Sequence, residues 1–152
     1  MSRIHVESER IIDAKPEEIY SFLADYEKRS RILPSSYLDY TVEKGGKGAG
    51  TVVSYKLHTS RGDRPYEMHI EEPSKGRVLM ERDASSSLIN TWTVTPAATN
   101  KQSRVALTTE WNSNSKGVGG FFERTFAPAA LRRIYGDLLG RLAQATARSS
   151  AS

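Results

Sequence analysis

The sequence predicts an α+β fold in which a curved antiparallel sheet of about seven strands wraps around one long C-terminal helix. Two patterns point to it. Apolar residues recur at helical spacing near both ends of the chain, and they alternate with polar residues in the region between them. The alternating segments are joined by short turns. Parallel neighbours would need long crossovers, so these strands pair antiparallel.

The N-terminal part predicts a strand followed by two short helices. Residues 3–12 alternate, which is typical of a strand. Pro16, with acidic residues after it, marks the first turn of a helix. The apolar face of this helix consists of Ile19, Phe22, Leu23 and Tyr26. A second helix is predicted over residues 27–33, ended by Pro34.

Six further strands are predicted, centred on residues 37–44, 53–57, 66–71, 78–81, 88–94 and 105–111. The closing helix has an apolar stripe made of Leu131, Ile134, Tyr135, Leu138, Leu142 and Ala145. Gly119, Gly120 and Pro128 predict that this helix opens irregularly or with a kink.

Length and composition indicate one globular domain. The chain has 152 residues, and we expect a single domain over 1–148 followed by a disordered tail over 149–152. A net charge of +4 points to no particular partner. The absence of cysteine excludes disulfides, thiolate nucleophiles and cysteine metal sites. No apolar run approaches the ~20 residues of a membrane span, and no signal core opens the chain, so we expect a cytoplasmic protein.

Motifs of cofactor, metal and nucleophile chemistry are missing. The glycine-rich stretch 45–50 contains Lys47 but does not match a phosphate-binding loop, so it predicts a hairpin turn. No G-x-S-x-G sequence is present. His5, His58 and His69 have no ligand-like spacing, and the last two fall on the outward parity of their strands. We therefore expect no metal and no cofactor.

Large amphipathic side chains dominate the predicted inner face: Tyr55, Tyr66, Trp92, Trp111 and Tyr135. Each needs a partner for its polar tip when buried. A hollow holding water or a ligand would supply those partners, and a dry core with satisfied hydroxyls explains them equally well. Asn90 and Thr109 also fall on inward parities, as does Arg82, which shares the parity of Val78 and Met80. Buried polar groups are kept when something bonds them.

Several local patterns resemble a known superfamily. They are the strand-to-helix opening over residues 12–25 (IDAKPEEIYSFLAD), the glycine turn before Thr51, the Trp92–Pro96 segment (WTVTP), the 104–108 strand (RVALT) and the long closing helix. Together they resemble the helix-grip SRPBCC superfamily, which includes START-related lipid-transfer domains, pollen-allergen-like proteins and polyketide cyclase/dehydrase-like proteins. The resemblance covers residues 3 to about 147. It departs where Ile32 and Leu33 replace an aromatic residue before Pro34.

The resemblance implies a largely apolar cavity between the sheet and the C-terminal helix. Ligand pockets commonly hold roughly 300–1,000 Å³. The candidate ligand-binding residues are Tyr55, Tyr66, Met68, Asn90, Trp92, Thr109, Trp111, Phe122, Leu131, Tyr135 and Leu138. We expect Tyr55, Tyr66 and Asn90 to orient ligand oxygens, although mutual bonding within the core explains each one equally well.

Three functions remain open. The first is binding or transport of a small hydrophobic molecule (a lipid, polyketide or aromatic metabolite), with Gly117, Gly119 and Gly120 as a hinge for entry. The second is an aromatase-type polyketide cyclase/dehydrase, for which Tyr55, Tyr66, Asn90 and Arg82 are the candidate groups and no base stands out. The third is a regulatory or toxin-like protein that acts through a protein partner. We favour the first and expect a monomer or weak dimer, no nucleic-acid partner and at most transient membrane contact.

Overall fold

The computed structural model describes residues 2–60, 62–113 and 117–151, with side chains described over 3–60, 62–113 and 127–147. The chain runs β1 (Ser2–Ile12), α1 (Pro16–Ala24), α2 (Tyr26–Arg29), β2 (Tyr37–Lys44), β3 (Val52–Thr59), β4 (Gly62–Ser74), β5 (Val78–Asp83), β6 (Ile89–Pro96), β7 (Ser103–Ser113) and α3 (Gly117–Ala151). Its sheet has seven antiparallel strands in the order β1-β7-β6-β5-β4-β3-β2. The predicted fold class is confirmed.

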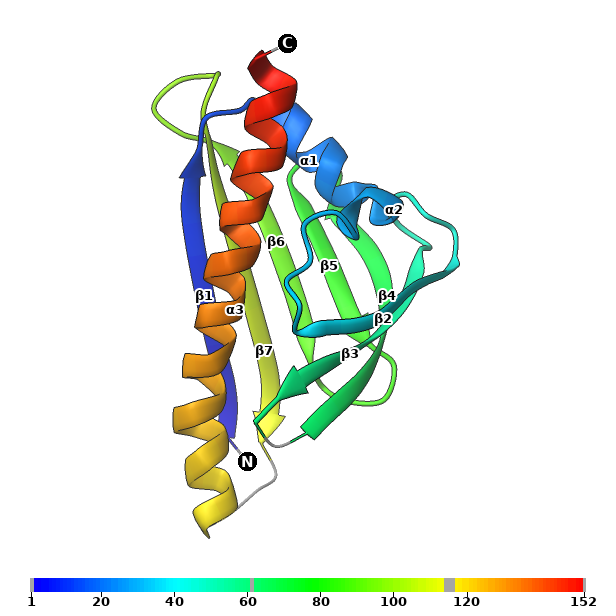
Figure 1. Ribbon diagram of the computed structural model, residues 1–152, viewed down its shortest axis with the longest axis vertical. Helices are drawn as coiled ribbons and strands as arrows, with labels where there is room; N and C mark the ends of the chain where they lie inside the picture. Colours follow the sequence, from blue (N-terminus) through cyan, green and yellow to red (C-terminus); the bar gives the residue numbers. More distant parts are fainter. Residues whose placement is uncertain (1, 61, 114–116, 152) are drawn as a thin grey trace.

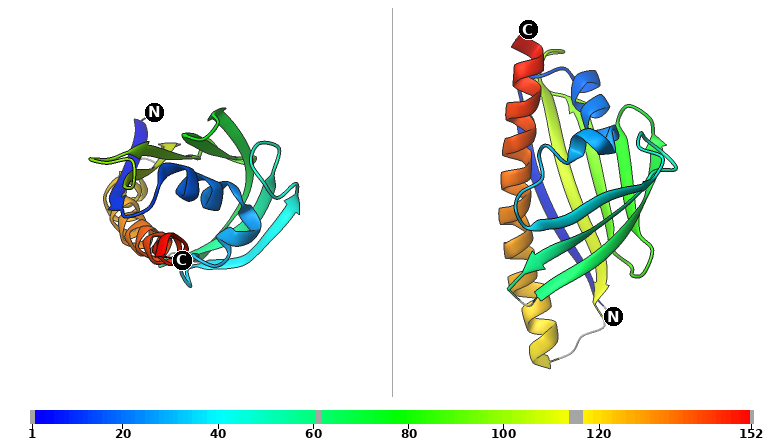
Figure 2. Two further views of the ribbon diagram at one scale, coloured as in Figure 1. Left: turned by 90° about the horizontal axis from the view of Figure 1, so that it is seen from above. Right: turned by 45° about the vertical axis from the view of Figure 1, so that its right-hand side comes forward.

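The sheet is strongly curved, and its concave side faces the helices (Figure 1). α3 runs alongside β1 for most of that strand's length, while α1 and α2 lie across one end of the curved sheet (Figure 2). β2, the last strand of the sheet, swings round to the side where α3 lies (Figure 1). Sheet and helices therefore enclose one interior, which is where the candidate site lies.

The core fills most of that interior. Its fully buried side chains come from β1, α1, the sheet centre and α3, and the largest include Trp92, Tyr26, Leu107 and Leu138. The predicted stripe of α3 is buried at Tyr135, Leu138 and Leu142. Burial of such a stripe, rather than helical propensity, supplies most of a helix's stability. Among the described residues, no helix has the length and hydropathy needed to cross a membrane.

The helices differ from their predicted forms in three ways. α3 is helical from Gly117 and continues through Pro128, so the predicted irregular opening is not seen. A proline inside a helix removes one hydrogen bond, and here its ring is buried. α3 also extends to Ala151, into the stretch that we expected to be disordered. α2 is only four residues long, because turns replace the helix after Arg29.

A β-bulge shapes β2 where it passes over the interior. Leu38 pairs with Lys56 and Thr41 with Ser54, so Asp39 and Tyr40 both lie opposite the single residue Tyr55. Asp39 has a φ of +54°, a left-handed conformation that Asp tolerates better than most residues. The bulge bends the strand. It also allows Tyr37 and Tyr40, three positions apart, to face the interior together.

The glycine-rich turn is fastened to the α1–α2 junction. The Gly48 N–H donates to the Ala24 carbonyl at 2.9 Å. Glu72 of β4 lies beside the turn and accepts from the Ala49 N–H at 2.8 Å and from the Tyr20 hydroxyl at 2.6 Å. The predicted turn is thus confirmed, and it holds α1 against β4.

We predict that Gly48→Ala destabilises the protein by about 1–3 kcal/mol. Gly48 has a φ of +63°, and a Cβ there would overlap the Glu72 carboxylate, which would have to leave both of its donors. Urea unfolding measures the loss.

Gly50→Ala is the matched control. Gly50 has a φ of +90° but nothing within 4 Å of an added Cβ, so it carries only the backbone strain of about 1–2 kcal/mol. An equal loss in both variants would contradict a role for the Glu72 contact.

Candidate functional site

A buried ion pair lies at the centre of the interior. Arg29 of α2 and Glu81 of β5 are each about 5% exposed, and Arg29 Nη2 lies 2.8 Å from Glu81 Oε2. The Tyr26 hydroxyl donates to the same oxygen at 2.7 Å, and Arg29 Nε donates to the Leu23 carbonyl at 2.9 Å. The guanidinium carbon lies 4.7 Å from the ring centroids of both Tyr26 and Trp92. Each charge is therefore paired, as burial requires.

Glu81 faces inward because the parity of β5 is the opposite of the predicted one. Leu79, Glu81 and Asp83 are buried, whereas Arg82 is exposed and pairs with Glu71 at 2.6 Å on the outer face. The prediction that Arg82 points inward is wrong. At the start of this strand, apolar residues occupy both odd and even positions, so the sequence pattern does not show which side chains face the interior.

A chain of hydrogen bonds connects this pair to α3. Asn90 Nδ2 donates to Glu81 Oε1 at 3.3 Å, and the Thr109 hydroxyl donates to Asn90 Oδ1 at 2.7 Å. The Tyr135 hydroxyl lies 2.5 Å from Thr109 Oγ1. Since the Thr109 proton is already used, Tyr135 donates in this contact. The donor and acceptor of each hydrogen bond in this series are then fixed, and the bonds run from α3 through β7 and β6 to β5.

Ionisation in the cluster follows from burial and charge. Burial lowers the pKa of Arg29, but the Glu81 carboxylate, Tyr26 and Tyr40 together raise it by more. Burial and the Glu81 charge raise the pKa of Tyr26 well above its usual value, and Arg29 offsets only part of this. Tyr37 and Tyr55 also have raised pKa values, chiefly through burial. At neutral pH the phenols are therefore neutral and can donate hydrogen bonds.

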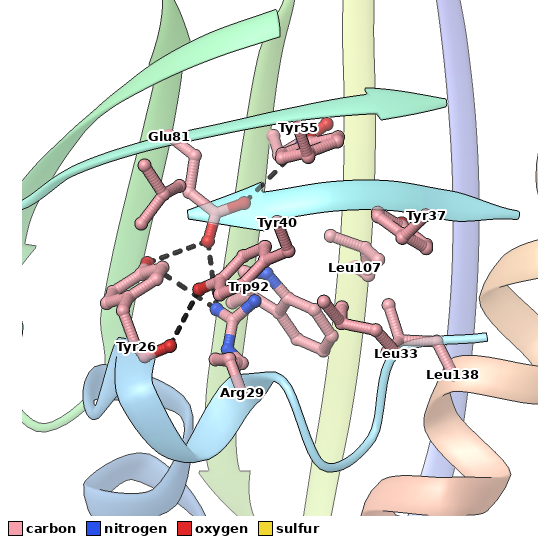
Figure 3. A pocket seen from close by; sticks show the side chains of 12 residues that line it. Tyr26, Arg29, Leu33, Tyr37, Tyr40, Tyr55, Glu81, Trp92, Leu107 and Leu138 are labelled. Atoms are coloured by element: carbon pink, nitrogen blue, oxygen red, sulfur yellow. Dashed lines mark hydrogen bonds and ion pairs between the residues drawn. The ribbon is translucent and has the colours of Figure 1, made fainter. Parts of the chain in front are cut away.

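A pocket adjoins the ion pair, between the sheet, the α2–β2 segment and α3 (Figure 3). Its lining comprises Tyr26, Arg29, Leu33, Tyr37, Tyr40, Val53, Tyr55, Glu81, Asn90, Trp92, Leu107 and Leu138. Its position is the predicted one, but its volume is only about 20 Å³. That is room for about one water molecule, so this conformation does not hold a ligand of metabolite size. A pocket is therefore present at the predicted place, but it lacks the volume of the predicted ligand cavity.

Three polar groups of the lining have no hydrogen-bond partner within the part of the chain that the structure describes. The rings of Tyr37 and Tyr55 lie 5.2 Å apart, and among the described residues neither hydroxyl has a hydrogen-bond partner. Tyr40, whose ring lies 6.3 Å from that of Tyr55, instead donates to the Tyr26 carbonyl at 2.7 Å. Trp92 Nε1 is buried and likewise has no acceptor among the described residues. The pocket thus offers unused hydrogen-bond donors.

The predicted ligand-binding residues divide into three groups. Tyr55, Asn90, Trp92 and Leu138 line the pocket. The others whose side chains are described lie around it: Thr109 and Tyr135 in the hydrogen-bond chain, Tyr66 with its ring 5.7 Å from that of Tyr55, and Met68, Trp111 and Leu131 in or against the core. The side chain of Phe122 lies outside the described residues. A binding role for the set remains a prediction.

The predicted ligand-binding set missed eight of the twelve lining residues. Arg29 and Glu81 were not among the predicted site residues, and only the opposite parity for β5 could have indicated Glu81. Tyr37 and Tyr40 fall on opposite parities, so the bulge had to be known before both could be placed inward. The histidines lie on the surface as predicted; His58 and His69, for example, contact Asp63 and Glu67.

The chain has clear relatives. The family described as "Polyketide cyclase / dehydrase and lipid transport" matches residues 3–147. The solution structure of KanY protein is similar at 38% sequence identity and a TM-score of 0.83, over 96% of this chain and 99% of that one. TTHA0849 from Thermus thermophilus is similar at 21% identity and a TM-score of 0.78, over 96% and 99% of the two chains.

The Zhui aromatase/cyclase from Streptomyces sp. R1128 is similar in fold, with 15% identity and a TM-score of 0.76 over 97% of this chain and 95% of that one. No curated protein sequence matches significantly.

We predict that Arg29→Met destabilises the protein by about 3–5 kcal/mol, because it leaves the Glu81 carboxylate buried without its cation. Arg104→Met is the matched control. Arg104 pairs with Glu9 at the same 2.8 Å, but both side chains are half exposed. Exposed pairs contribute less than about 1 kcal/mol. Similar losses in urea unfolding for the two variants would contradict the importance of the buried pair.

A second prediction concerns alkaline pH. All seven tyrosines have raised pKa values, with burial the largest cause in each. A group whose pKa is raised by folding stabilises the fold below its unfolded pKa, about 10 for tyrosine, and loses this contribution as the pH rises further. Phenolate absorbance should therefore be small at pH 10 and rise together with unfolding at higher pH. If the tyrosines instead ionise near pH 10 while the protein remains folded, the prediction is contradicted.

Proposed function

The chain belongs to the polyketide cyclase / dehydrase and lipid transport family, and from this premise we propose that it binds a small, largely apolar molecule between the sheet and α3 and releases it unchanged. The molecule would occupy an expanded form of the pocket beside Arg29 and Glu81. Apolar contact would supply most of the affinity, at about 25 cal/mol per Å² of buried surface.

One observation carries this proposal: the pocket lining combines apolar surface with unused donors and no free base. Leu33, Leu107 and Leu138 supply apolar contacts, and the Tyr37 and Tyr55 hydroxyls are available as donors. Glu81, the carboxylate of the lining, already accepts from Tyr26, Arg29 and Asn90. Such a lining can orient a molecule, but it has no group ready to take a proton from it.

Binding requires the pocket to widen, and α3 is the element best placed to move. Among the described residues, the Tyr135–Thr109 contact is the one side-chain hydrogen bond that joins α3 to the sheet. The side-chain hydrogen bonds of Arg141 and Thr146 stay within the helix. A displacement of α3 would break the Tyr135–Thr109 contact and some apolar packing. Helix displacements of this kind are a common route to ligand entry.

A second candidate function is carbonyl chemistry of the cyclase/dehydrase type. The observation in its favour is that Tyr37 and Tyr55 are neutral phenols, which could donate to a developing oxyanion. Aldol closure also needs a base for the proton next to a carbonyl. Glu81 would have to give up the hydrogen bonds that now occupy it. For that reason we rank this function second.

Native mass spectrometry of the freshly purified protein tests the proposal. We expect a noncovalently bound molecule that is released on unfolding and rebinds the refolded chain. Tyr55→Phe should weaken rebinding by about threefold to tenfold, the value of one neutral hydrogen bond. Tyr20→Phe is the matched control, because the Tyr20 hydroxyl bonds Glu72 outside the pocket.

The outcomes are distinct. Conversion of the rebound molecule into a product would favour the enzyme. A chain that purifies empty and binds no apolar small molecule would contradict the proposal.

A further inference from the structure

A buried hydrogen bond ties the turn of α3 that borders the pocket to the sheet. Within the described part of the chain, α3 contributes Leu138 to the pocket lining, and Tyr135 lies one turn before it on the same side of the helix. The Tyr135 hydroxyl lies 2.5 Å from Thr109 Oγ1, and these two residues are 4% and 0% exposed. In this conformation, which we call the closed form, the pocket has room for about one water molecule.

We propose that the Tyr135–Thr109 hydrogen bond holds the pocket in its closed form, and that breaking this bond is the step that admits a ligand. The inference rests on the proposed function and specifies how that site is regulated. Tyr135 does not line the closed pocket. It is therefore a positioning residue, which acts on the ligand through the position of α3.

The apolar packing of α3 cannot hold the pocket closed in the same way, because an apolar ligand replaces it. Leu138, Leu139 and Leu142 are each at most 2% exposed and belong to the core. Hydrophobic contact is non-directional, so a ligand can cover the apolar surface that separates when α3 moves outward. A hydrogen bond needs an acceptor at a fixed place, and an apolar surface offers none to the Tyr135 hydroxyl. The polar contact thus favours the closed form alone.

The series of hydrogen bonds is arranged so that it can separate at Tyr135. Thr109 donates its proton to Asn90 Oδ1 at 2.7 Å, so it only accepts from Tyr135. Asn90 in turn donates to Glu81, which pairs with Arg29. When Tyr135 withdraws, these other bonds all remain, and water can accept from its hydroxyl. Opening at this turn therefore breaks a neutral hydrogen bond and leaves the buried charges paired.

The expected effect of Tyr135→Phe follows from linkage between opening and binding. A ligand that binds the open form has an apparent Kd equal to its intrinsic Kd divided by the open fraction. Removing the bond from the closed form should raise the open fraction by about threefold to tenfold, the value of one neutral hydrogen bond. We therefore expect this variant to unfold at lower urea concentration and yet to bind a ligand about threefold to tenfold more tightly. A residue that only stabilises the fold, or that contacts the ligand, would not produce this combination.

N-phenylnaphthylamine, an uncharged apolar molecule that fluoresces in apolar surroundings, is a suitable probe for the full chain. Tyr135→Phe should lower its Kd by raising the association rate constant, while the dissociation rate constant changes by less than about twofold. Thr109→Val removes the acceptor and should act in the same direction. Tyr20→Phe is the matched control, because it loses a 2.6 Å hydrogen bond to Glu72 outside the pocket. Its Kd for the probe should stay within about twofold of the unaltered chain.

The unaltered chain offers an independent measurement. A buried, hydrogen-bonded hydroxyl proton exchanges slowly with water, and saturation with the probe should speed the exchange of the Tyr135 hydroxyl proton. If Tyr135→Phe binds the probe with unchanged or lower affinity, or if Tyr20→Phe gains as much affinity, the proposed regulation is wrong while the binding function stands. If the probe binds neither the unaltered chain nor the variants up to its solubility limit, the proposed function fails and the regulation with it. Should neither Tyr135→Phe nor Thr109→Val fold, the exchange of the hydroxyl proton decides alone.

Discussion

The buried charge of Glu81 is the constraint on which the rest of the interior depends. A carboxylate on the concave side of a sheet must be matched by a cation and by donors. Arg29 supplies the cation, which fixes α2 against the sheet, and Tyr26 and Asn90 supply the donors. Through Asn90 and Thr109 the same carboxylate orients the hydroxyl of Tyr135 on α3. One side chain thus links the short helices, the sheet and the long helix.

The fold could be predicted from the sequence because its signals are local. Alternation, turn residues and the proline at the start of α1 each depend on a few neighbouring residues, and they agree with one another. Errors appear where the local pattern does not decide. In β5 both parities begin with apolar residues, so the inward face is set by pairing with β4 and β6. At Pro128 tertiary packing accommodates a residue that usually interrupts a helix.

The candidate site was only partly predictable, for a related reason. Aromatic residues on regular strands, such as Tyr55 and Trp92, could be placed inward from parity. Arg29 and Glu81 are polar, and only their mutual contact makes their burial tolerable, which no single position reveals. The pocket volume could not be predicted from the sequence, because it depends on how closely α3 approaches the sheet. A difference of a few ångströms there separates a packed core from a ligand site.

The bulge at Asp39 has a consequence for how this site could diversify. Because Asp39 is the additional residue opposite Tyr55, removing it would restore regular pairing while Tyr37 and Tyr40 kept their inward orientation. What would change is the bend of the edge strand and its distance from the opposite wall. A one-codon deletion at this point would therefore change the size of the pocket and leave its chemical lining intact.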